Sequence, residues 1–343
     1  MRGRLLALGI AVLAGAGAIV GCSLILTFPD YVGDGCAHTR WPDRPTSAAP
    51  GGNRELVGAV KKMVFFTGAD AGFDLDGLCT CPDKPACKSP KGPKENCDLP
   101  SGTGIDNVGG SFIKGLYPPN DELQASLDQG KSGLVIRVQG FNGTPNDNDV
   151  VVSVYNVAAL EVPPAKYDGA DVYDIDTASI LTPPSGSKYI DPNAYISNGI
   201  LVAQLELDIR LDVKGSSSLP PSADVVFLPL HQVKLVGRIE PVSGGGLKLT
   251  SATIAGRLTS TKALHEVGRL GLCQDGAAYQ GAKFQTCQSA DLAADHSEDG
   301  QDKACQAVSF TLQIDVVPAK LGQVVPARTA PDLCPGEPDD RCN

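Results

Sequence analysis

The clearest alternation of apolar and polar positions in this chain runs from Leu201 to Val213, "LVAQLELDIRLDV". The odd-numbered positions are all apolar, whereas positions 204, 206, 208, 210 and 212 carry Gln, Glu, Asp, Arg and Asp. Successive side chains of a β-strand point to opposite sides, so the run predicts a strand with one buried and one solvated face. Such alternation is typical of antiparallel sheets.

Other runs of the same kind predict further strands over 61–68, 133–143, 149–157, 224–240, 246–260 and 307–317. Asn142-Gly143 and the polar residues after it predict a hairpin with a long loop. The alternation changes phase near Ser251, where we expect a bulge or a bend.

Two short helices are expected between the strands. In the first, over 120–133, Asn120 suits the N-cap, Leu123 and Leu127 share one face, and Gly130 suits the C′ position. The second, over 259–273, ends at Gly271. Many short strands separated by turns predict a mainly β fold, for which we expect an antiparallel two-sheet sandwich with jelly-roll-like connections and disulfide-stapled loops.

The N-terminus has the pattern of a secretory signal over residues 1–21, with Arg2 and Arg4 before the apolar run Leu5–Val20. That run is short for a transmembrane helix. It ends in Ile19-Val20-Gly21-Cys22, which resembles the lipobox of bacterial lipoproteins.

This resemblance implies cleavage before Cys22 and acylation of its sulfur, with palmitate among the attached chains. Because Ser23 follows, it also implies the outer membrane, on the periplasmic or cell-surface side. The Pro- and Gly-rich stretch 22–55 is then a flexible lipidated tether, and 56–343 forms the folded domain, including a cysteine-rich insert at about 68–110.

The number of cysteines agrees with lipidation of Cys22, because the chain has eleven of them and exported proteins normally pair theirs. Lipidation leaves ten disulfide candidates, five before Gly102 and five after Arg269. Each group is odd, so complete pairing requires at least one bridge between the groups. The candidates are Cys36, Cys79, Cys81, Cys87, Cys97, Cys273, Cys287, Cys305, Cys334 and Cys342.

The C-terminal run "HEVGRLGLCQDGAAYQGAKFQTCQSADL" also resembles uncharacterised lipoproteins of GC-rich Gram-negative bacteria, and this resemblance implies no particular activity. The formal net charge of −10, without a basic cluster, argues against a nucleic-acid partner. No catalytic motif is complete: "HEVGR" begins like a zinc-protease helix but has Arg269 where the second ligand belongs.

Two acidic regions are candidate sites. Asp70, Asp74 and Asp76 lie close together beside Gly77, which suits Ca²⁺, although aspartates are also common turn residues. A long region without a clear strand contains tyrosines and carboxylates able to hold a sugar, or else packs as a connection: Tyr167, Asp168, Asp171, Tyr173, Tyr189 and Tyr195.

These observations favour a lipid-anchored envelope protein whose domain is a non-enzymatic binding module for a glycan or a protein. A hydrolase that uses the carboxylates of the tyrosine region, and a purely structural envelope component, are the alternatives.

Overall fold

The computed structural model describes residues 37–47, 51–65, 71–79, 86–89, 103–109, 120–181, 186–214, 223–240, 242, 246–326, 333–334 and 340–342. The signal segment, Cys22, Cys36, Asp70, Cys81 and Cys97 lie outside these residues.

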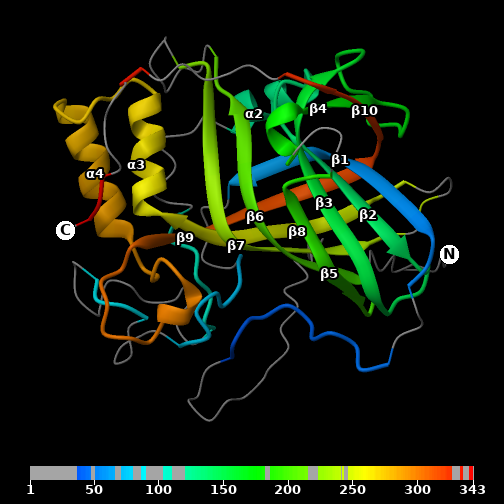
Figure 1. The fold of residues 1–343 in the computed structure, drawn as a ribbon, viewed down its shortest axis with the longest axis horizontal. Helices are drawn as coiled ribbons and strands as arrows, with labels where there is room; N and C mark the ends of the chain where they lie inside the picture. Colours follow the sequence, from blue (N-terminus) through cyan, green and yellow to red (C-terminus); the bar gives the residue numbers. More distant parts are fainter. Residues whose placement is uncertain are drawn as a thin grey trace, which may run out of the picture.

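Eight antiparallel strands make up the centre of the molecule (Figure 1). They are β1 (Arg54–Phe65), β2 (Leu134–Phe141), β3 (Asp147–Leu160), β5 (Tyr189–Ser197), β6 (Ile200–Asp212), β7 (Val225–Ile239), β8 (Leu249–Thr259) and β9 (Ala307–Pro318). Each pairs with the next strand of this series, and β9 pairs with β1. The sheet therefore closes on itself.

β3 changes its partner along its length. Its residues Asp147–Val154 pair with β5, whereas Val157–Leu160 pair with β4 (Val172–Asp176). The last strand, β10 (Lys320–Val325), runs parallel to β4. The prediction of a mainly β fold is confirmed. The predicted two-sheet sandwich is not, because the ten strands form one hydrogen-bonded sheet, in which the additional pairing of β3 with β5 closes the ring of eight strands.

The inside of the closed sheet holds the main core. Apolar residues from all eight strands join one cluster, together with Leu123 and Leu127 of α2 (Asn120–Asp128) and Ala263 of α3 (Ser260–Arg269). The first predicted helix is confirmed, and Gly130 after it has φ +62°, as a C′ glycine requires. The second is confirmed as α3, which packs against α4 (Ala277–Ser289) through Leu264, Val267 and Tyr279.

The alternation of β6 is confirmed on its apolar side, where the odd-numbered residues from Leu201 to Val213 are all buried. On the other side Gln204 and Glu206 are exposed, but Arg210 and Asp212 are buried, contrary to the predicted solvated face. Residues of other strands and turns cover this half of β6, and the Arg210 Nη1 donates to the carbonyl of Val157 at 3.1 Å. The predicted irregularity at Ser251 is also confirmed, by φ +48° and a register shift between β8 and β9.

The two cysteine-rich segments pack on the outside of the sheet and are tied together. Three disulfides are described: Cys87–Cys305, Cys273–Cys334 and Cys287–Cys342. Cys79 is also disulfide-bonded. A second apolar cluster joins the first of these segments to outward-facing strand residues, and it includes Phe73, Leu75, Ala86, Val202, Val236 and Ala255.

Candidate functional site

Residues 38–45, which we call the strap, lie against the outside of the sheet. The Tyr195 hydroxyl donates to the carbonyl of Pro42 at 2.6 Å, and the Arg44 guanidinium lies 4.7 Å from the Tyr195 ring. The Trp41 ring meets Phe73 edge-on at 5.8 Å. This part of the predicted tether is therefore docked on the domain, because its aromatic side chain finds apolar partners.

Two neighbouring irregularities in β6 and β7 shape the sheet surface beside the strap. The register shifts between Leu205 and Leu207 in β6, and β7 shifts after His231, where Gln232 has φ +51°. Glu206 bridges the two strands: its carboxylate accepts from the Gln232 N–H at 3.1 Å and lies 2.5 Å from the His231 Nδ1. Bulges of this kind redirect side chains and are frequent next to functional sites.

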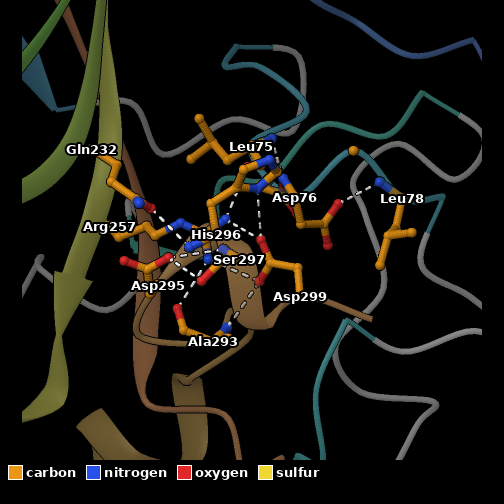
Figure 2. Close-up of polar contacts among 12 residues, drawn as sticks. Leu75, Asp76, Leu78, Gln232, Arg257, Ala293, Asp295, His296, Ser297 and Asp299 are labelled. Atoms are coloured by element: carbon orange, nitrogen blue, oxygen red, sulfur yellow. Dashed lines mark hydrogen bonds and ion pairs between the residues drawn. The ribbon is translucent and has the colours of Figure 1, made fainter. Parts of the chain in front are cut away.

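A turn that contains the 3₁₀ helix η3 (His296–Glu298) forms the facing wall. The Gln232 side-chain carbonyl accepts from the His296 backbone N–H at 2.9 Å, which joins the turn to β7 (Figure 2). Ser297 caps the turn by donating from its N–H and its hydroxyl to Asp295, at 2.8 and 2.7 Å. These hydrogen bonds lower the pKa of Asp295 to about 2, since they favour its charged form.

Arg257 of β8 is almost completely buried, and Figure 2 shows it among the residues of the turn. Its guanidinium forms a two-pronged ion pair with Asp299, with Nη1 3.0 Å from Oδ1. It also donates to the carbonyls of Ala293 and Leu75, both at 2.9 Å. One side chain thus holds the turn and the first cysteine-rich segment against the sheet.

The strap, the irregular strands and the turn enclose a cavity of about 180 Å³, which we call the strap pocket. Most of the residues that line it are polar, and they include four basic side chains and one carboxylate. The lining residues are Arg40, Trp41, Asp74, Leu75, Gly77, Gln204, Gln232, Lys234, Arg257 and His296.

Lys234 lies between the strap and β6. Its ammonium group donates to the side-chain carbonyl of Gln204 and lies 4.3 Å from the centre of the Trp41 ring, a cation–π contact. Burial lowers the pKa of Lys234 below its ordinary value. The pocket therefore holds an ammonium group that has lost part of its hydration.

The predicted tyrosine region does not form a single site. Tyr167 lies in the loop before β4 and Tyr173 belongs to β4, whereas Tyr189 and Tyr195 belong to β5. The Tyr167 hydroxyl donates to Asp128 at 2.8 Å and that of Tyr189 to Asp208 at 3.1 Å. Burial raises the pKa of Tyr167 and of Tyr189, and that of Tyr195 to about 12.

The carboxylates of that region support its backbone. Asp168 accepts from the Ala170 N–H at 2.9 Å, and Asp171 accepts from the Tyr167 N–H at 2.6 Å. These contacts are those of a packed connection, the other interpretation that the sequence allowed.

Among the residues proposed for calcium, Asp74 and Asp76 lie together with Asp106, with one oxygen of each within 4.8 Å of the others, and Asp70 lies outside the described residues. Asp74 already contacts His38 and lies 3.6 Å from the Arg40 Nε.

The oxygens of this acidic cluster also accept backbone hydrogen bonds. The N–H of Gly77 donates to Asp74 at 2.6 Å, that of Leu78 to Asp76 at 2.7 Å, and that of Leu75 to Asp106 at 2.7 Å. These contacts serve turn formation, and calcium binding stays a prediction.

Sequence reasoning missed the strap pocket. Trp41, the only tryptophan, falls in the stretch predicted to be a flexible tether, and Lys234 and Arg257 fall in predicted strands without any motif around them. Trp41, an aromatic residue in an otherwise polar stretch, is the feature of the sequence that indicates docking of this segment.

No protein-family model, curated protein or solved structure matches this chain. Within the described part of the chain, every helix is too short or too polar to cross a membrane.

Proposed function

We propose that this protein is a lipid-anchored binding module of the bacterial outer membrane, and that it binds a glycan in the strap pocket. The acyl anchor on Cys22 is its contact with the membrane. The tetrad Ile19-Val20-Gly21-Cys22 supports the anchor. The three described disulfides support export, because such bonds persist in oxidising compartments.

The observation that carries the glycan proposal is the convergence of polar side chains on a cavity beside an aromatic ring. Gln204 and Gln232 offer amide donors and acceptors, and Arg40 and Lys234 offer donors only. Sugar hydroxyls both donate and accept, so they match this mixture. A concave site with a few converging polar groups is the usual form of a small-molecule pocket.

The contacts of the tyrosine region do not favour the hydrolase alternative. A carboxylate pair for acid–base catalysis must face the substrate. Asp168 and Asp171 instead accept hydrogen bonds from the backbone of their own loop.

A glycan array tests the proposed function. The full chain, purified in detergent micelles, should bind a subset of the glycans, and Gln204→Ala should weaken that binding at least fivefold. Gln139→Ala is the matched control, because Gln139 lies on β2 and contacts Glu55 outside the pocket. A blank array, or equal binding by Gln204→Ala and wild type, would reject the glycan proposal. A blank array would leave a protein as the partner to be sought.

A further inference from the structure

We infer that the strap pocket selects a saccharide that carries an acidic group, a carboxylate or a phosphate, and that this group pairs with Lys234. The inference rests on the proposed function and adds the charge of the ligand to it.

The other basic side chains of the pocket already have carboxylate partners. Arg257 pairs with Asp299, whose Oδ2 also lies 3.0 Å from the His296 Nδ1. Arg40 lies 3.6 Å from Asp74. Each of these side chains already lies beside a carboxylate of the protein, so none of them requires an acidic ligand.

Lys234 differs from these residues, because it forms no ion pair with any residue that the structure describes. Its ammonium group contacts a neutral amide oxygen of Gln204 and the face of Trp41. The charge of Asp191 acts on it from beyond ion-pair distance. Asp191 itself is buried, and its oxygens accept from the N–H groups of Asn193 at 2.9 Å and Gln204 at 2.7 Å.

A partly buried cation that forms no ion pair with the described residues favours an anionic ligand. Burial has removed part of the water that stabilised the charge, and an acidic group would restore that stabilisation through a charge-assisted hydrogen bond. Gly77, at φ +76°, leaves room for the Arg40 guanidinium beside the same cavity, since a Cβ there would lie 3.0 Å from Nη2. Arg40 also lines the pocket, so its guanidinium is a second donor beside the same cavity.

The size of the pocket points to a sugar that carries the anion rather than to the anion alone. The cavity of about 180 Å³ extends from Lys234 to Gln232 and His296, well beyond one anion. The amides of Gln204 and Gln232 are suited to neutral hydroxyl groups, which a free anion lacks.

The fluorescence of Trp41 reports on this site, because it is the only tryptophan of the chain and lines the pocket. The full chain in detergent micelles is titrated with glucose, glucuronate, glucose 6-phosphate and sodium sulfate at equal ionic strength. Calorimetry gives a second readout. We expect glucuronate or glucose 6-phosphate to bind at least tenfold more tightly than glucose and than sulfate, and their order identifies the acidic group.

Two outcomes would overturn the inference. If glucose binds as tightly as both charged sugars, the site binds glycans without selecting charge, and the proposed function stands. If sulfate binds as tightly as the charged sugars, the pocket is a plain anion site. If none of the sugars binds and the glycan array is blank, the proposed function fails together with the inference.

Substitutions at Lys234 test its role directly. Lys234→Met removes the charge but keeps an unbranched stem against Trp41, so it should abolish the preference for the charged sugars over glucose. Lys234→Arg should retain the preference. Lys248→Met is the matched control, because Lys248 pairs with Glu240 elsewhere on the surface. A preference that survives in a folded Lys234→Met protein, as judged by its melting curve, contradicts the assignment.

Discussion

Cys87 and Cys305 form a disulfide that joins the first cysteine-rich segment to the residues just before β9, across 218 positions of the chain. The odd number of cysteines at each end of the sequence predicted a bridge between the two groups, and this bond confirms it. In the chain-entropy account, a cross-link stabilises the fold by restricting the unfolded chain, more so when it closes a longer loop.

Removal of this disulfide should therefore cost more stability than removal of a bond that closes a shorter loop. We expect Cys87→Ala with Cys305→Ala to lower the free energy of unfolding by about 3–5 kcal/mol. The pair Cys287→Ala with Cys342→Ala opens a bond across 55 positions, and should cost about 1 kcal/mol less. Denaturant unfolding measures both. A larger loss for the shorter loop would show that local packing outweighs chain entropy here.

The ion pair between Arg257 and Asp299 should contribute far more than the exposed pairs of the same turn. Both side chains are almost fully buried, so Arg257→Met leaves a buried carboxylate without its partner, at a cost of about 3–5 kcal/mol. Lys303→Met breaks the exposed contact with Glu298 and should cost under about 1 kcal/mol. Similar denaturation midpoints for the two variants would refute the supporting role assigned to Arg257.

Much of the sheet could be predicted because its signals are local. The alternation in β6, the glycine after α2 and the phase change at Ser251 each depend on neighbouring residues. β5 was missed because its sequence contains Asp191, Pro192 and Asn193, residues typical of turns. α4 was also missed, since few of its residues are buried and its apolar positions have weak helical periodicity.

The closure of the sheet and the strap pocket depend on contacts between distant parts of the sequence. β1 meets β9, and β3 meets both β4 and β5, through pairings that no local pattern specifies. The pocket likewise combines Trp41, Lys234 and His296 from three separate segments. The spacing of residues along a single sequence does not predict that such distant segments come together.

The membrane anchor has a direct test. If Cys22 carries the acyl chains, Cys22→Ser should move the full chain from the membrane to the soluble fraction or leave its signal segment uncut, because the acyl chains supply the membrane affinity. Cys36→Ser is the control, since it changes a nearby cysteine outside the tetrad and should stay anchored. Fractionation with a carbonate wash measures this, and a Cys22→Ser protein that still pellets contradicts the lipoprotein proposal.

The ionisation of the Asp291 carboxyl group should lower the stability of the protein as the pH rises above about 4. It is buried, and burial raises its pKa to about 6, although the N–H and hydroxyl of Ser309 donate to it at 2.7 and 2.6 Å. An unfolded aspartate has a pKa of about 3.9, so between these values the folded state binds the extra proton. Stability then falls with rising pH and levels off above about pH 6, with a total loss on the order of 3 kcal/mol.

Asp291→Asn removes this titration and keeps hydrogen-bonding groups toward Ser309. The difference in unfolding free energy between the variant and the wild type should therefore grow in favour of the variant from pH 4 to pH 7. Asp302→Asn removes a negative charge from an exposed side chain and controls for the change in net charge. Denaturant unfolding at each pH gives the values. The difference in unfolding free energy between Asp291→Asn and wild type could instead stay constant over this range. Asp291 would then have the same proton affinity in the folded and unfolded states, contrary to its burial.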